Sequence, residues 1–139
     1  MPARYLVDTS ALARSERSGV KERLRPLFES GQAAICGVIA LEMLYSTRSL
    51  ADMSARRVDL ARTFVRVAMT EADLERAEAL MQDLASQGMH RAAGPADLLV
   101  AACAERTDVT ILHYDADFDL IASITGQRAE WVVPRGSVP

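Results

Sequence analysis

Lysine is nearly absent from this chain: Lys21 is the only one, and arginine carries almost all of the basic charge. The formal net charge is −3 over 139 residues, so the protein lacks the positive excess by which coating proteins cover nucleic acid. Arginine nevertheless suits phosphate recognition, because its planar guanidinium group can bind two oxygens at once. Any contact with nucleic acid is therefore expected to be local and assisted by a metal ion.

Cysteine and histidine are also scarce, and their positions argue against a disulfide and against a zinc site. Cys36 and Cys103 each lie in a small apolar segment, where we expect buried thiols rather than a disulfide or a metal pair. His90 and His113 are isolated, and neither cysteine has a histidine or second cysteine at ligand spacing. A zinc site is therefore not expected.

Long hydrophobic runs are missing too. No apolar segment approaches the roughly 20 residues needed to cross a bilayer, and the N-terminus leads into a predicted strand without the pattern of a signal peptide. Half of the residues are nevertheless hydrophobic, which suffices for a real core in a chain of this length. We expect one cytoplasmic domain over residues 1–133, followed by a mostly polar tail over residues 134–139.

Strand-like and helix-like segments alternate through much of the chain, which favours an α/β fold with a mostly parallel sheet covered on both faces. Pro26 can kink or divide the second helix. Strands are predicted at residues 4–7, 33–36, 67–69, 110–113 and 131–133. Helices are predicted to begin near residue 10 and to cover residues 20–29, 38–45, 51–65, 70–87, 95–106 and 118–124.

Four acidic residues occupy positions that such a fold would bring together. Asp8 and Asp115 follow predicted strands, and open parallel sheets bind ligands beyond the carboxyl ends of their strands. Glu42 and Asp97 each lie in an otherwise apolar helix, where a buried carboxylate needs a partner or a cation. Because clustered carboxylates repel one another, we expect the oxygen-binding ions Mg²⁺ or Mn²⁺ as counter-ions.

Each acid also has a structural explanation when it is considered alone. Asp8 can cap the helix that follows it, and Asp115 and Asp117 can be turn or capping residues. Asp97 lies in the first turn of its helix, where the helix dipole favours a carboxylate. Glu42 can form a buried salt bridge with an arginine. The joint placement of the acids, rather than any single one, indicates a metal site.

Four segments together resemble the PIN-domain nucleases, and among them the VapC-type toxin ribonucleases. They are VDTS at residues 7–10, LEMLY at residues 41–45, ADLLVAACA at residues 96–104 and LHYDADFDLIA at residues 112–122. The resemblance implies a three-layer α/β/α sandwich with a central, mostly parallel sheet. It also implies metal ligands at Asp8, Glu42, Asp97 and Asp115, with Asp117 matching a further aspartate of the family pattern.

One position departs from that pattern. The family often has threonine or serine two residues before the fourth acid, where this chain has His113. A contact with substrate phosphate and a space-filling role at the strand end are both open to this side chain. We expect the second.

The resemblance further implies the reaction and the partners. The first four acids would act as the catalytic residues, holding one or two Mg²⁺ or Mn²⁺ ions that activate water to hydrolyse an RNA phosphodiester bond. A cognate antitoxin protein would cover the site, and a second copy of the toxin would complete a homodimer. Arg14, Arg17 and Arg91 are the candidates for RNA contacts at the rim of the site.

Two other classes of function remain as alternatives. A Mg²⁺-dependent phosphoryl-transfer domain would also gather acids. A receiver domain needs a lysine near a late strand, however, and a haloacid-type phosphatase needs Asp-x-Asp where this chain has Asp8-Thr-Ser10. The second alternative is a non-catalytic interaction module, in which the carboxylates only pair with arginines.

Overall fold

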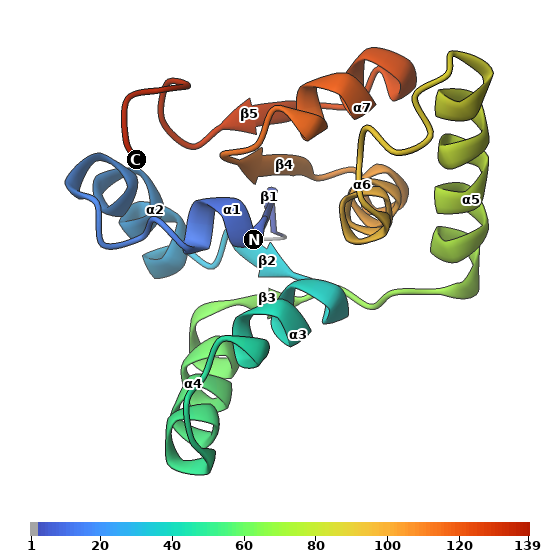
Figure 1. Cartoon of the computed structure of the whole chain (residues 1–139). Coiled ribbons are helices and arrows are strands. Elements are labelled where there is room, and N and C mark those ends of the chain that lie inside the picture. The colour runs from blue at the N-terminus through green and yellow to red at the C-terminus, as the bar shows by residue number, and fades with distance from the viewer. Residues whose placement is uncertain (1–2) are drawn as a thin grey trace.

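The computed structural model describes residues 3–139 and contains a five-stranded sheet in which every pair of neighbouring strands is parallel (Figure 1). The strands are β1 (Tyr5–Val7), β2 (Ala33–Ile35), β3 (Val65–Arg66), β4 (Thr110–His113) and β5 (Ala129–Trp131). Their order across the sheet is β3-β2-β1-β4-β5. The strand order therefore reverses between β1 and β4, which is where open parallel sheets place their ligands.

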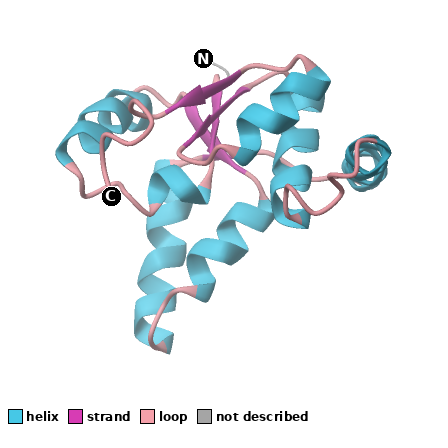
Figure 2. Cartoon of the chain, turned by 45° about the horizontal axis from the view of Figure 1, so that its top comes forward, coloured by secondary structure: helices cyan, strands magenta, loops and turns pink. Residues whose placement is uncertain are grey.

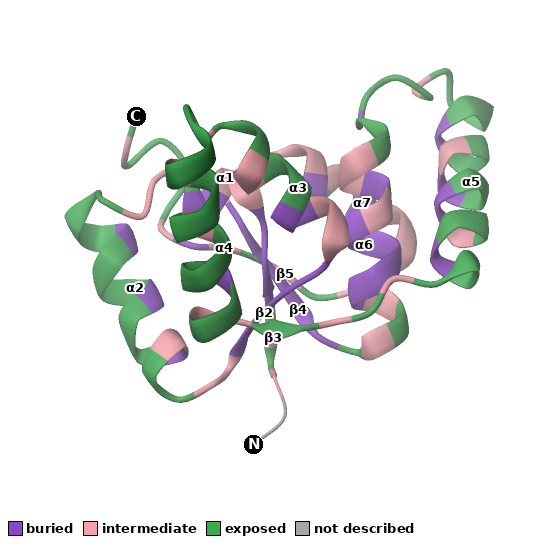
Figure 3. Cartoon of the chain, turned by 90° about the horizontal axis from the view of Figure 1, so that it is seen from below, coloured by how far each residue is buried: buried purple, intermediate pink, exposed green. Residues whose placement is uncertain are grey.

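Within residues 3–139, seven helices connect and cover these strands. They are α1 (Thr9–Leu12), α2 (Ser18–Glu29), α3 (Gly37–Tyr45), α4 (Leu50–Thr63), α5 (Glu71–Ser86), α6 (Pro95–Thr107) and α7 (Asp117–Thr125). The strands lie between α2 on one side and α6, backed by α5, on the other (Figures 1 and 3). The predicted three-layer α/β/α architecture is thereby confirmed. None of the described helices is long and apolar enough to span a membrane.

The helices α3 and α4 form a hairpin that projects away from the rest of the fold (Figures 1 and 2). Only Ile39 and Ala40 of α3 and Leu60 of α4 are buried. Several large apolar side chains of the hairpin are consequently exposed, among them Leu41 and Tyr45. The sequence pattern of α3 predicts a buried helix, and this prediction is wrong because the hairpin leaves the sheet.

Several element boundaries also differ from the predictions. β3 lies at Val65–Arg66 rather than at residues 67–69, and α4 accordingly ends at Thr63. β5 begins at Ala129, two residues before the predicted strand. Both are edge strands, whose ends are set by pairing with β2 and β4 rather than by hydrophobicity. Pro26 does not interrupt α2; it lies on the exposed side, where water can bind the carbonyl it leaves unpaired.

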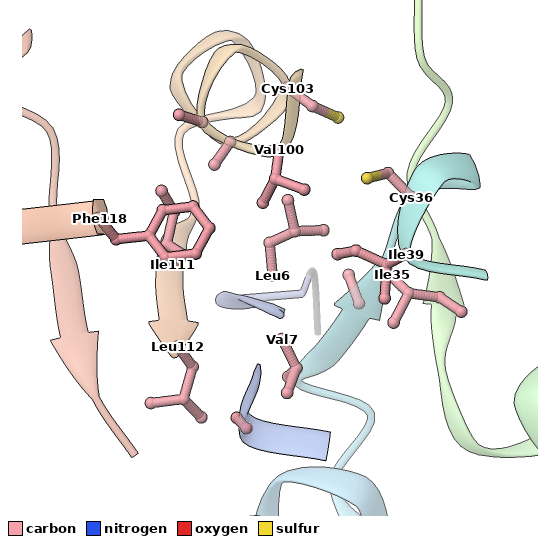
Figure 4. Close-up of a cluster of buried hydrophobic side chains, with 14 of the residues drawn as sticks. Leu6, Val7, Ile35, Cys36, Ile39, Val100, Cys103, Ile111, Leu112 and Phe118 are labelled. Atoms are coloured by element: carbon pink, nitrogen blue, oxygen red, sulfur yellow. The ribbon is translucent and has the colours of Figure 1, made fainter. Parts of the chain in front are cut away.

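One part of the core lies between the central strands and α6. Leu6, Val100, Ile111 and Phe118 are buried side chains of β1, α6, β4 and α7 that meet there (Figure 4). Cys36 and Cys103 lie in the same core as free thiols that point toward each other, so their predicted burial is confirmed (Figure 4). Central strands that are buried on both faces read as continuous apolar runs, which is why β1 and β4 are predictable from the sequence.

An ion pair with a buried acid attaches α5 to α6. Asp73 accepts hydrogen bonds from Nε and Nη2 of Arg106 at 2.7 and 3.1 Å, and its side chain is only 1% exposed. It also accepts the backbone N–H of Thr70, in the capping box that begins α5. Burial tends to raise the pKa of Asp73, but Arg106 and Thr70 outweigh it and hold the pKa below its usual value.

Replacing Arg106 by methionine is expected to lower the melting temperature by several degrees, since Asp73 would stay buried without its cation. Arg76→Met is the matched control in the same interface. Its partner Glu105 is 33% exposed, so this loss should change the melting temperature by no more than about two degrees. Thermal unfolding of both variants at pH 7 tests the difference, and equal losses would contradict it.

Candidate metal centre

Two of the acids extend from the strands on either side of the point where the sheet order reverses. Val7 pairs with Leu112 as the last residue of β1, and the N–H of Asp8 donates to the carbonyl of Leu112 at 2.9 Å. Asp115 lies two residues after His113, the last residue of β4. Asp8 and Asp115 therefore leave the sheet on neighbouring strands.

Asp8 also caps α1, and Asp115 forms a turn that leads into α7. Asp8 is 4% exposed, and its carboxylate accepts the N–H of Ser10 at 2.9 Å, at the start of α1. Asp115 accepts the N–H of Asp117 at 2.9 Å, at the start of α7. The capping interpretation of Asp8 and the turn interpretation of Asp115 are thus correct. They do not compete with a metal site, because each bond uses one oxygen and orients the other.

The first turns of α6 and α7 bring two further acids to the same place. Pro95 begins α6, which puts Asp97 in its first turn, and Asp117 is the first residue of α7. Carboxylate oxygens of Asp97, Asp115 and Asp117 all lie within 4.8 Å of one another, and the three side chains are half-buried. Asp117, the fifth acid of the predicted set, is therefore part of the cluster.

Glu42 reaches the site from α3. It is exposed, and its Oε1 accepts a hydrogen bond from Oγ1 of Thr9 at 2.9 Å. The expected burial of Glu42 is therefore wrong, because α3 belongs to the projecting hairpin. The competing interpretation as a buried salt bridge with an arginine is also excluded by this exposure.

Asp97 lies electrostatically at the centre of the five acids. Burial raises the pKa of Asp97 first, and repulsion from Asp8, Asp115, Asp117 and Glu42 raises it further, to about 7. The pKa of Asp8 is raised mainly by its own burial, against hydrogen bonds from Ser10 that lower it. Burial and the charge of Asp115 likewise raise the pKa of Asp117. The cluster therefore resists full ionisation in the absence of a cation.

The chain supplies no such cation through the ion pairs of residues 3–139, since none of them involves any of the five acids. A purely oxygen-donating, negatively charged cluster fits a hard divalent ion. This arrangement argues against the module in which the carboxylates merely pair with arginines.

His113 is fully buried beside the acids. Its ring packs against Phe118 and Trp131, with centroids 5.2 and 5.1 Å away, which confirms the expected space-filling role. Its Nδ1 also accepts the N–H of Asp115 at 3.1 Å and so fixes the turn between β4 and α7. Because burial lowers the pKa of His113, the ring is neutral at pH 7.

The three arginines predicted to contact RNA differ in their exposure and in their hydrogen bonds. Arg14 is engaged, since its Nη1 donates to the carbonyl of Ser10 at 2.7 Å and its Nε donates to that of Pro139 at 3.0 Å. Arg17 and Arg91 are exposed. Arg56 of α4 is a further arginine near the site, which the sequence does not predict; it lines a groove next to Glu42. Arg56 lies next to Glu42 because α3 packs on α4, and no local sequence pattern predicts that contact.

This groove has a volume of about 770 Å³ and lies between α1 and α2 on one side and α3 and α4 on the other. Apolar side chains and acids both line it. The apolar ones include Leu12, Phe28, Met43 and Phe64, and the acids are Glu16, Glu42 and Asp59. The groove is thus continuous with the acidic site at Glu42.

A parallel sheet with carboxylates gathered where its strand order reverses defines the class: an α/β protein with an acidic, oxygen-donating centre. Comparison with known proteins makes this specific. The chain matches the PIN domain over residues 5–124. It is 38% identical over 138 residues to Ribonuclease VapC51 of Mycobacterium tuberculosis, covering 99% of both chains. Over 137 residues it is 38% identical to Ribonuclease VapC21 of the same organism, again covering 99% of each.

The chain therefore belongs to the PIN domain family, within its group of VapC ribonucleases, as the sequence motifs predict. Solved structures agree on the fold. The crystal structure of DNA-bound VapBC from Salmonella typhimurium is similar with a TM-score of 0.77, covering 94% of this chain and 99% of that one. Its sequence identity of 17% supports the fold alone.

Proposed function

We propose that this protein is a metal-dependent endoribonuclease and the toxin of a toxin–antitoxin pair, acting in the cytoplasm on RNA. The observation that carries the proposal is the cluster at Asp97, where carboxylate oxygens of three aspartates lie within 4.8 Å of one another and no ion pair of the described chain neutralises them. Relatives of full length named as ribonucleases support the reaction.

In this proposal Asp8, Glu42, Asp97 and Asp115 hold one or two Mg²⁺ or Mn²⁺ ions, with Asp117 beside them. A bound divalent ion supplies a water of lowered pKa and offsets the charge that develops on the phosphate. The chain's own contribution is to orient the ligands. Ser10, Thr9 and Asp117 do so through hydrogen bonds to Asp8, Glu42 and Asp115, as described above.

No side chain is needed as a dedicated base in this scheme. His113, the histidine nearest the acids in sequence, is neutral, buried and already bonded through Nδ1 to a backbone amide. A water held among the five acids can pass its proton to a carboxylate or to solvent. This agrees with the small number of histidines and lysines in the chain.

Removing divalent metal is expected to abolish RNA cleavage. The test incubates total RNA with the purified protein in Mg²⁺ or Mn²⁺, adds EDTA in a parallel sample, and maps the cleavage ends by sequencing. Cleavage should stop with EDTA and return with excess metal, and the faster ion identifies the better cofactor. Cleavage that persists in EDTA, or hydrolysis of a small chromogenic phosphate ester in place of RNA, would contradict the proposal.

We propose that the groove beside Glu42 receives the antitoxin. Its apolar lining suits an amphipathic segment, and its acids suit basic side chains that could reach the carboxylates. The similar solved structures include VapBC from Salmonella typhimurium and a toxin–antitoxin complex from Klebsiella pneumoniae, which supports this kind of partner. An antitoxin bound there would block the access of RNA to Glu42.

We also propose that a second copy of the chain covers the outer face of α3. Leu41 is 69% exposed and Tyr45 is 92% exposed, which is unusual for large apolar side chains one helical turn apart. A homodimer through α3 would bury both. A Tyr45→Glu variant that remained a dimer in sedimentation analysis would argue against this face.

A further inference from the structure

After β5 the C-terminal segment turns and ends beside α2 instead of extending away from the fold (Figure 1). We call residues 136–139 the C-terminal strap. The hydroxyl of Tyr114 donates to the carbonyl of Val138 at 2.8 Å, and it accepts the N–H groups of Gly136 and Val138 at 2.9 and 3.2 Å. This hydroxyl therefore makes three hydrogen bonds to the strap, which are all that its donor and two lone pairs allow.

Arg14 joins the strap to α1. Its guanidinium carbon lies 4.5 Å from the centroid of the Tyr114 ring, a favourable cation–π arrangement. The Nε atom donates to the carbonyl of Pro139 at 3.0 Å, and Nη1 donates to the carbonyl of Ser10 at 2.7 Å. Arg14 and Tyr114 are both half-buried, so solvent only partly competes with these contacts.

Tyr114 is connected to two of the acids, to Asp8 through Ser10 and to Asp115 as its neighbour in the chain. The N–H of Tyr114 donates to Oγ of Ser10 at 2.9 Å, and the N–H of Ser10 donates to Oδ2 of Asp8 at 2.9 Å. Tyr114 also immediately precedes Asp115. The contacts of the strap thus converge on the two strand ends that carry Asp8 and Asp115.

The hydrogen bond between Tyr114 and Ser10 matters because pairing between β1 and β4 has ended at this point. The last residue pair is Val7 with Leu112; beyond it, β1 is followed by α1 and β4 is followed by α7. Beyond this pair, the Ser10–Tyr114 bond joins the two segments in addition to the backbone bond from Asp8 to Leu112, and Asp115 is also bonded to His113. Metal ligands must be held to a fraction of an ångström to be effective, and outer residues provide that hold.

We propose that Tyr114 and Arg14, held by the C-terminal strap, are positioning residues that fix Asp8 relative to Asp115. The inference rests on the proposed function, since it assigns these residues to the same metal centre. Neither side chain needs to touch substrate or metal. Arg14, whose side chain is bound to Ser10, Pro139 and Tyr114, has this positioning role in place of a contact with RNA.

Tyr114→Phe removes the three strap bonds and keeps the ring that stacks on Arg14. We expect kcat for RNA cleavage to fall about tenfold, with KM for RNA changed less than about twofold, and Mn²⁺ affinity of the protein without RNA to fall by a similar factor. Tyr5→Phe is the matched control, because the described residues offer no hydrogen bond to the Tyr5 hydroxyl, and it should change neither quantity.

Trp131 reports on the strap without metal or substrate. It is the only tryptophan, its ring lies 5.2 Å from that of Tyr114, and the guanidinium carbon of Arg135 lies 5.6 Å from its centroid. Release of the strap moves Arg135, so the emission of Tyr114→Phe should differ from that of the parent protein. Tyr5→Phe should leave the emission unchanged.

Gly136→Ala tests the same contact from the other side. Gly136 has φ +80°, which alanine adopts only with strain, and the space around it is open, so the variant affects the strap and nothing else nearby. Both substitutions break the same contact, the one between Tyr114 and the strap. The double variant should therefore lose no more activity than the stronger single variant.

Unchanged kcat and Mn²⁺ affinity in both variants would overturn the positioning role, and so would faster cleavage, which would mean that the strap restrains the site. If the parent protein binds Mn²⁺ but cleaves no RNA, the proposed function fails. The fall in Mn²⁺ affinity in Tyr114→Phe still decides the positioning role in that case.

Discussion

Asp97→Asn is expected to reduce metal-dependent RNA cleavage by about a thousandfold or more, because it removes a proposed charged metal ligand from the acidic cluster. The four other acids all raise the pKa of Asp97, which places it within the field of each of them. Asparagine preserves the shape of the side chain but offers a neutral oxygen. The measurement is the initial rate on a defined RNA at saturating Mn²⁺, together with Mn²⁺ affinity by calorimetry.

The same substitution should leave the protein folded. Asp97 makes no ion pair among the described residues, and its charge is repelled by its neighbours, so its removal should raise the melting temperature of the metal-free protein at pH 8. Asp83→Asn, an exposed aspartate of α5, is the matched control and should change neither activity nor melting. A folded Asp97→Asn variant with full activity would refute the assignment of the metal centre.

The strand-end acids were accessible to sequence reasoning because local patterns determine them. The buried runs of β1 and β4 fix where Asp8 and Asp115 lie, and Pro95 fixes the first turn that carries Asp97. A parallel sheet then brings these ends together without further information. The resemblance to the VapC ribonucleases matched the order of these acids to a family pattern and matched Asp117 to a further aspartate of that pattern.

What the sequence does not determine depends on contacts between distant segments. The exposure of Glu42 follows from the projection of the α3–α4 hairpin, and an apolar helix gives no sign of whether its apolar residues meet a core or a partner chain. The strap is a second case. The sequence predicts only a mostly polar tail, and nothing in it indicates that backbone groups of Gly136 and Val138 bind the side chain of Tyr114, 22 and 24 residues earlier.

Lowering the pH from 8 to 6 is expected to weaken Mn²⁺ binding about tenfold, because Asp97 must then lose a proton before it can bind the ion. In the metal-free protein its pKa is raised from 3.8 to about 7, first by burial and then by the surrounding acids. At pH 8 the carboxylate is ionised and the ion displaces no proton; at pH 6 about nine molecules in ten carry one. Calorimetric titrations with Mn²⁺ across this range measure the effect.

The stability of the metal-free protein should respond to pH in the opposite direction. A carboxyl group whose pKa is raised by folding contributes stability that is complete below its unfolded pKa and is lost as the pH rises through its folded pKa. For Asp97 this loss is centred near pH 7, so the metal-free protein should melt at a lower temperature at pH 8 than at pH 6. Saturating Mn²⁺ should reverse the order, because the ion binds best where Asp97 is ionised. In Asp97→Asn this component of the pH dependence should disappear. If the parent protein and this variant respond to pH alike, Asp97 does not have the central electrostatic position inferred for it.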